Sequence, residues 1–228
     1  MRAAQKSNRG APLYSRVVNR PLGRVFAAAA YRLGLTPNRV TMISAAFTFA
    51  GIAALATWSP SWTMAVATCL LLVVGYALDS ADGQVARLRG GGSAAGEWLD
   101  HIFDAMKLAT FHLAIAVSLY RFADLTSDLL LLVPLAFSAV SCVMFFAFIL
   151  TDKLRAPRGP ALASEDSDRP SILRSVLAAP TDYGFLCVVP LLLPVTVLFL
   201  AVYGVLLLGS AGYLTLALGK WYRDMQRV

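Results

Sequence analysis

Residues 70–107 read LLLVVGYALDSADGQVARLRGGGSAAGEWLDHIFDAMK, and four aspartates stand at helical spacings in and beyond an apolar run. Asp79 and Asp82 are spaced i, i+3, and Asp100 and Asp104 are spaced i, i+4, so each pair lies on one face of its own helix. An ionised carboxylate near the bilayer centre costs roughly 2.5–3.5 kcal/mol on insertion scales. Because carboxylate oxygens are the ligands that hard divalent cations prefer, we expect these four side chains to converge on a metal site.

The composition places this site in a membrane protein. The chain has 228 residues, of which 58% are hydrophobic and only 14% are charged. Several segments approach the ~20 apolar residues that cross a bilayer. We therefore predict an all-α integral membrane protein with six transmembrane helices. The predicted spans are residues 41–58, 61–78, 106–120, 129–150, 184–200 and 201–219. The last two are nearly continuous, and Pro190 and Pro194 interrupt the first of them, so their boundary could shift by a helical turn.

The basic residues predict the orientation of these spans. Residues 1–40 hold eight arginines and lysines and no acid, which by the positive-inside rule places the N-terminus in the cytoplasm. With six spans, segments 79–107, 151–182 and 220–228 fall on the same side, and the last two bring basic residues there. We therefore expect a protein of the cell membrane whose two termini and aspartate site face the cytoplasm.

Three regions follow along the chain. Residues 1–40 form a basic N-terminal region, in which 13–35 mixes arginines with apolar side chains as an amphipathic helix on an anionic membrane surface does. Residues 41–219 form the six-helix transmembrane domain, and 220–228 form a cytoplasmic tail. A basic inner face suits an anionic leaflet, so the net charge of +7 needs no nucleic acid as a partner.

The aspartates belong to a longer pattern. Asp79 to Asp104 fit D-x2-D-G-x2-A-R-x8-G-x3-D-x3-D in full, with Gly83, Ala86, Arg87 and Gly96 at the other fixed positions. This pattern resembles that of the CDP-alcohol phosphotransferases, also called CDP-alcohol phosphatidyltransferases. Eight fixed positions make the match specific. The glycine-rich gap and the segment LTPNRVT at 35–41 are most similar to bacterial phosphatidylinositol phosphate synthases.

The resemblance implies a metal-dependent transferase of phospholipid biosynthesis. It would move a phosphatidyl group from a CDP-linked donor, with CDP-diacylglycerol favoured, to a hydroxyl of a polar acceptor of the inositol phosphate or glycerol phosphate type, releasing CMP. Two Mg²⁺ or Mn²⁺ ions are implied, with Asp79 and Asp100 bridging them, Asp82 completing one site, and Asp104 completing the other while acting as general base. A homodimer is implied by the resemblance alone.

The substrate contacts are predicted with alternatives. Small Gly83 and Ala86 admit a nucleotide or close helix packing, and Arg87 offers a planar fork for phosphate oxygens. Asn38 either lines the cytidine side or caps a helix. By resemblance, the donor-binding set is Asn38, Arg39, Val40, Thr41, Gly83, Ala86, Arg87 and Ser93. Lys153 and Arg155 would suit a phosphorylated acceptor, or they are ordinary positive-inside charge.

Two other functions stay open. One is a transferase that uses a soluble donor of the CDP-choline or CDP-ethanolamine type with a lipid acceptor. The other is a non-catalytic cation or proton carrier, since carboxylates inside a membrane also build ion pathways. An ion path gains nothing from Arg87, five residues beyond Asp82, whereas a pyrophosphate pocket does.

The glycines at 90–92 predict a turn that folds the second aspartate pair onto the first.

Overall fold

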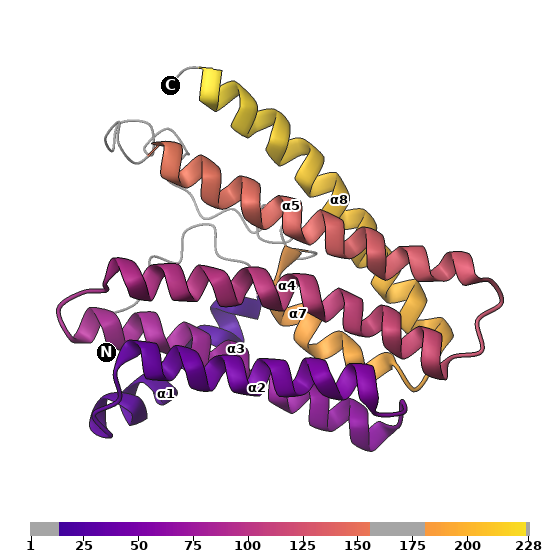
Figure 1. The fold of residues 1–228 in the computed structure, drawn as a ribbon, viewed down its shortest axis with the longest axis horizontal. Helices are drawn as coiled ribbons and strands as arrows, with labels where there is room; N and C mark the ends of the chain where they lie inside the picture. Colours follow the sequence, from indigo (N-terminus) through magenta and orange to yellow (C-terminus); the bar gives the residue numbers. More distant parts are fainter. Residues whose placement is uncertain (1–13, 156–180, 227–228) are drawn as a thin grey trace.

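A computed structural model describes residues 14–155 and 181–226, and every regular element within these ranges is helical (Figure 1). Five helices are long and apolar enough to cross a membrane. They are α2 (Pro37–Thr57), α3 (Trp62–Leu88), α4 (Ala94–Phe122), α5 (Leu132–Arg155) with the preceding 3-10 turn η3 (Asp128–Leu131), and α8 (Thr196–Gln226). The shorter elements are η2 (Ser15–Asn19), α1 (Arg20–Arg32), α7 (Tyr183–Val188) and η7 (Val189–Leu192). The predicted all-α, multi-pass architecture is confirmed.

Helices α2 and α3 approach each other closely because small residues line their contact. A Cβ added at Gly75 would lie 2.3 Å from Thr48 Oγ1 and 3.0 Å from the Thr48 nitrogen. Ser44 Oγ donates to the Gly75 carbonyl at 2.8 Å. In lipid, close backbone approach and interhelical hydrogen bonds of this kind replace the hydrophobic driving force. This contact lies one helical turn before Asp79, so it fixes the position of α3 close to its first aspartate.

The glycine segment forms the predicted turn between α3 and α4. Gly90 and Gly91 have φ of 95° and 132°, a region that residues with a Cβ rarely adopt. Ser93 then caps α4, its Oγ accepting from the Gly96 nitrogen at 3.0 Å. The aspartates therefore lie on extensions of the two spanning helices themselves. The spans predicted to end at 78 and to begin at 106 were too short at these ends.

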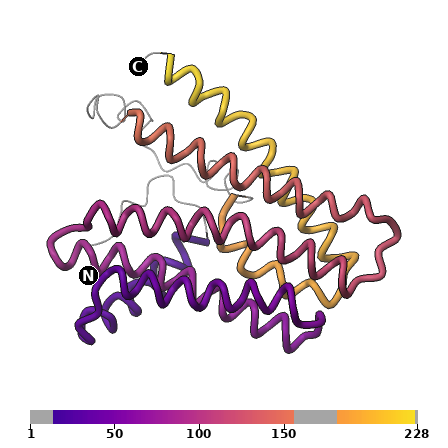
Figure 2. Tube along the Cα trace, in the orientation of Figure 1, coloured from indigo at the N-terminus to yellow at the C-terminus, as the bar shows by residue number. Residues whose placement is uncertain are grey.

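Helices α5 and α8 pack against each other, and α5 also packs on α4. Together they diverge from the other helices toward the end of the bundle that carries the α3–α4 turn (Figures 1 and 2). A buried polar cluster joins the three helices: the two ring nitrogens of His112 lie 2.5 Å from Tyr203 Oη and 2.9 Å from Ser141 Oγ. The same ring stacks on Phe137 at 4.3 Å. His112 is thus a satisfied core residue.

The last two predicted spans differ from the structure. The expected boundary at residues 200 and 201 is wrong, because α8 runs unbroken from Thr196 through both positions. The break falls at 193–195 instead, at Pro194, which lacks the backbone N–H that a continuing helix would use. Within the described residues, the segment before this break is helical only over Tyr183–Leu192, which is shorter than a span. Helix α8 also continues through 220–226, the residues predicted as a tail.

The described part of the N-terminal region is helical from Tyr14 to Arg32. Helix α1 packs on α3, burying Gly23, Ala27 and Ala30, while Val17 and Val25 remain exposed. A Cβ added at Gly23 would lie 2.8 Å from Ser80 Oγ, so the contact with α3 is close. Residues 1–13, the first part of the predicted region, lie outside the described ranges. The location of α1 on a membrane surface stays a prediction.

Candidate active site

The four aspartates converge between α3 and α4. Carboxylate oxygens of Asp79, Asp82 and Asp100 all lie within 4.8 Å of one another. A second group within the same limit contains Asp100, Asp104 and a ring nitrogen of His101. The structure thus places the ring of His101 beside the site. The two groups share Asp100, and their four carboxylates offer the hard oxygen donors that divalent cations prefer, with one ring nitrogen beside them.

Asp82 is held by two hydrogen bonds. Thr41 Oγ1 donates to Asp82 Oδ2 at 2.6 Å, and the Gly83 nitrogen donates to Oδ1 at 2.5 Å. The side chain is 7% exposed. Partners of this kind orient a metal-ligating carboxylate. The sequence predicts Thr41 only as a residue of the donor-binding set. Its contact with Asp82, 41 residues away, has no counterpart in the sequence pattern.

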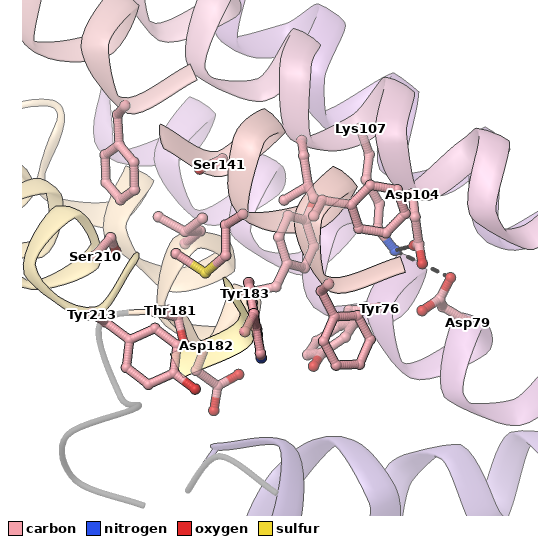
Figure 3. Close-up of a pocket in the computed structure, with 17 residues that line it drawn as sticks. Tyr76, Asp79, Asp104, Lys107, Ser141, Thr181, Asp182, Tyr183, Ser210 and Tyr213 are labelled. Atoms are coloured by element: carbon pink, nitrogen blue, oxygen red, sulfur yellow. Dashed lines mark hydrogen bonds and ion pairs between the residues drawn. The ribbon is translucent and has the colours of Figure 1, made fainter. Parts of the chain in front are cut away.

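A lysine that the sequence analysis did not single out lies within the aspartate cluster. Lys107 Nζ is 2.5 Å from Asp104 Oδ1 and 3.2 Å from Asp79 Oδ1 (Figure 3). The ammonium also lies over the rings of Tyr76 and Tyr183, at 5.9 and 5.2 Å from their centroids. A signal was present in the sequence, since a lysine inside an apolar span needs a partner and Asp104 is at i−3.

A cavity of about 830 Å³ adjoins one side of the cluster, and we call it the donor cavity. It is enclosed by the beginnings of α2 and α4, the end of α3 and the glycine turn. Six of the eight residues predicted to bind the donor line it, together with Asp82 and Asp100: Asn38, Thr41, Gly83, Ala86, Arg87 and Ser93. Arg89, Gly91, Gly92 and Glu97 also line it, and the motif does not name them.

Arg39 and Val40 are not among the residues lining the donor cavity. Val40 is 1% exposed and packs with Ala81 and Val85. The side chain that caps α2 is Thr36, whose Oγ1 accepts from the Arg39 nitrogen at 3.4 Å, so Asn38 is not the cap. A Cβ added at Gly96 would lie 3.0 Å from Asn38 Oδ1, which explains why the motif needs a glycine where α4 meets α2.

A second cavity, of about 450 Å³, adjoins Asp79 and Asp104, and we call it the inner cavity. Asp79, Asp104 and Lys107 form part of its wall (Figure 3). Much of the remaining wall is aromatic or aliphatic, including Phe137, Met144, Phe145, Phe148, Leu186 and Trp221. A third cavity of about 390 Å³ is lined by all four aspartates, with Arg20, Arg87 and His101. The aspartates therefore lie between a polar space and a largely apolar one.

Asp182 closes the inner cavity near the N-terminal segment. Its carboxylate accepts hydrogen bonds from the nitrogens of Gly184 at 3.1 Å and Ser15 at 3.2 Å. The residue is 1% exposed, and these backbone donors offset the cost of burying its carboxylate. The contact ties the start of α7 to η2 across the bundle.

Lys153 and Arg155, predicted to bind the acceptor, lie near the end of α5. Lys153 Nζ is 2.5 Å from Glu97 Oε1, and Arg155 pairs with Asp224 of α8. Neither lies among the residues lining the three cavities described above. Their role toward an acceptor stays a prediction.

Comparisons with known proteins agree with the motif. The family model described as CDP-alcohol phosphatidyltransferase matches residues 34–218. A comparison with curated protein sequences finds no match. Among solved structures, the chain is similar to the Mycobacterium tuberculosis phosphatidylinositol phosphate synthase PgsA1 with CDP-DAG bound, with a TM-score of 0.56 and 20% identity. The match covers 90% of this chain and 94% of that one, and at this identity it is a likeness of fold.

The family model spans the whole motif, both aspartate pairs and four of the five long helices completely. These helices build the donor cavity and the cluster of carboxylates beside it. The chain therefore belongs to the CDP-alcohol phosphatidyltransferase family and is a transferase.

Proposed function

We propose that the protein transfers a phosphatidyl group from CDP-diacylglycerol to a hydroxyl of a polar acceptor, of the inositol phosphate or glycerol phosphate type, and releases CMP. One observation carries the proposal: the aspartates lie between the donor cavity and the largely apolar inner cavity. A donor with a polar nucleotide and a lipid needs both kinds of surface close to its pyrophosphate. The M. tuberculosis structure with CDP-DAG bound supports the choice of donor.

The residues of the cluster fit two Mg²⁺ ions, with Mn²⁺ as the alternative. Asp79, Asp82 and Asp100 would hold one ion, and Asp100 and Asp104 would contribute to the other. Bound divalent ions would neutralise and polarise the donor pyrophosphate. The hydrogen bonds to Asp82 keep its two oxygens oriented for this role.

The reaction assigns a task to each nearby side chain. The guanidinium of Arg87 would bind donor phosphate oxygens, and Gly83 and Ala86 would let the nucleotide approach the α3 backbone. The acceptor oxygen forms a bond to the β-phosphorus of the donor while the bond from this phosphorus to the CMP oxygen breaks. Asp104, on the wall of the inner cavity, would take the proton of the acceptor hydroxyl.

We further propose that the site faces the cytoplasm from the cell membrane, with six crossings and a homodimeric assembly. The α3–α4 turn and the C-terminal ends of α5 and α8 lie at one end of the bundle (Figure 1). The Arg155–Asp224 pair joins the latter two ends, and α7 and η7 precede α8 along the chain. We count the segment that contains α7 and η7 as the additional crossing, and the basic residues at this end support the cytoplasmic location of the site.

Release of CMP by the purified protein tests the proposal. CDP-diacylglycerol and Mg²⁺ are supplied with inositol phosphate, glycerol phosphate, inositol or serine, and CDP-choline with diacylglycerol forms a separate arm. We expect release with CDP-diacylglycerol and one polar acceptor, and loss of release with EDTA. Release only in the CDP-choline arm would show that the donor is a soluble CDP-alcohol and not CDP-diacylglycerol. Failure to bind CMP or CDP would contradict a transferase and favour an ion carrier.

Arg87→Ala separates the transferase from the carrier more directly. The substitution should weaken CDP-diacylglycerol binding by about tenfold or more, the order expected for losing a charged hydrogen bond. Arg223→Ala, on the exposed end of α8, is the matched control. Unchanged nucleotide affinity in Arg87→Ala would count against the donor site proposed here.

A further inference from the structure

We propose that Lys107 is a positioning residue of the transfer reaction: its ammonium holds the carboxylates of Asp79 and Asp104 in the orientation in which Asp104 meets the acceptor. The inference rests on the proposed function and adds a residue that the family motif does not contain. It also predicts that the Lys107 ammonium competes with divalent metal ions for these two carboxylates.

The position of Lys107 is fixed from several directions. The residue is 8% exposed, and its closest approach to each carboxylate is to Oδ1. Tyr76 of α3 and Tyr183 of α7 present their ring faces to the ammonium. A cation enclosed by two carboxylates and two aromatic rings has little freedom to move. The carboxylates that it contacts are therefore held as well.

The carboxylates beside the two cavities are supported by different partners. Asp82, on the donor side, is oriented by Thr41 and the Gly83 nitrogen and lines the donor cavity. Asp79 and Asp104 share Lys107 and line the inner cavity. Lys107 is absent from the residues that line the donor cavity. Its loss should therefore affect the chemical step on the acceptor side more than donor binding.

A neutral side chain at this position would leave two carboxylates without their cation. Asp104 would lose its defined orientation, and a base misplaced by about 1 Å can lose on the order of 100-fold in rate. The same change would remove a positive charge in contact with two proposed metal ligands, so divalent cations should bind more tightly. A lysine that only balanced charge for folding would not produce this pair of effects.

The test compares Lys107→Met and Lys107→Arg with Lys220→Met, an exposed lysine on α8. Kinetics of CMP release give kcat and the donor KM, and electron paramagnetic resonance of Mn²⁺ gives divalent affinity without turnover. For Lys107→Met we expect kcat to fall by about 100-fold, the donor KM to stay within about threefold, and Mn²⁺ to bind about tenfold more tightly. For Lys107→Arg, whose charge is carried on a larger group, we expect kcat to fall at least about tenfold with Mn²⁺ affinity near that of the unmodified protein.

The outcomes decide between the inference and the function on which it rests. A kcat within about threefold of the unmodified protein in either variant would overturn the inference, and so would unchanged Mn²⁺ affinity in Lys107→Met. If Lys107→Met does not fold, Lys107→Arg is judged by its own kcat and KM. If the unmodified protein releases no CMP, the proposed function fails, and the Mn²⁺ measurement still decides whether Lys107 competes with the metal.

Discussion

At the scale of single residues, the carboxylates of Asp79, Asp82 and Asp104 and the ammonium of Lys107 all have partners within the described structure. Lys107 lies between two aspartates, and Asp82 accepts from a threonine and a backbone nitrogen. In a bilayer, groups of this kind persist only where the fold supplies partners. Substitution of the residues that contact the carboxylates therefore tests the site as directly as substitution of the aspartates does.

Replacing Thr41 with valine removes the hydroxyl that donates to Asp82 and keeps the shape of the side chain. A hydrogen bond to a charged group contributes about 1.5–3 kcal/mol, so we expect at least about a tenfold rise in the Mg²⁺ concentration that gives half-maximal CMP release. Thr41→Ser keeps the hydroxyl and should retain most of the affinity. A Mg²⁺ dependence in Thr41→Val equal to that of the unmodified protein would exclude a role for this hydrogen bond.

Asp104→Asn tests the proposed base. The amide keeps the size of the side chain and cannot take a proton, so turnover should fall by about 10²–10⁴-fold while the helical circular dichroism spectrum is retained. Asp124→Asn, in the exposed loop after α4, is the control for loss of a carboxylate. Substantial turnover in the Asp104 variant would assign proton removal to another group.

The aspartate cluster could be predicted from spacing alone, because helical periodicity is local and four carboxylates at these intervals beside an apolar run need a cation to offset their charge. The contact of Lys107 with Asp79 and that of Thr41 with Asp82 could not, since these partners are 28 and 41 residues apart and the pairing depends on how α2, α3 and α4 cross. Arg39 and Val40 show the reverse case. They adjoin residues of the site in sequence, yet the helical turn directs them away from the donor cavity.

At the scale of elements, the helices continue where the apolar pattern ends. Helix α3 continues to Leu88, ten residues beyond the predicted end of its span, because its polar side chains turn toward the site and the glycine turn comes only afterwards. The apolar composition therefore predicts the presence of these helices correctly, but it does not predict the residues at which they end. The boundary before α8 was misplaced for a related reason, since the glycines within α8 do not break it, whereas Pro194 lies at the break.

The α2–α3 crossing provides a test at this scale. Gly75→Ala places a Cβ 2.3 Å from Thr48 Oγ1, so the helices must separate or the side chain must move. Overpacking of this kind costs typically about 1–3 kcal/mol, and the thermal unfolding midpoint in detergent should fall. The control is Gly204→Ala in α8, where the added Cβ meets nothing within 4 Å and helix propensity should make the change neutral or stabilising. Equal midpoints for the two variants would contradict close packing at Gly75.

At the scale of the whole molecule, the path of the chain fixes which loops share a side of the membrane. The α1–α2 connection and the α3–α4 turn lie at one end of the bundle, with the C-terminal end of α8, and η3 lies at the other (Figure 1). This arrangement agrees with an even number of crossings. The sequence predicted the even count from charge, although one of the predicted spans is helical over only ten described residues.

Cysteine labelling in membrane vesicles tests this path. In a variant without Cys69, Cys142 and Cys187, single cysteines replace Leu33, Leu129 or Tyr222, all of which are exposed. Leu33→Cys and Tyr222→Cys should react with an impermeant maleimide in inside-out vesicles only. Leu129→Cys should react in right-side-out vesicles only. Labelling of the first two positions from opposite sides would require an odd number of crossings.

The position of the aspartates between two cavities has a consequence for the order of events in turnover. If the nucleotide of the donor lies in the donor cavity and the acceptor hydroxyl approaches from the side of Asp104, both substrates can be bound at the same time, and no side chain has to carry the phosphatidyl group between them. Initial rates measured against both substrates should therefore give intersecting rather than parallel reciprocal plots. Attack from one cavity with departure of CMP into the other is a single in-line displacement, and a chiral phosphorothioate donor should emerge with inverted configuration at phosphorus.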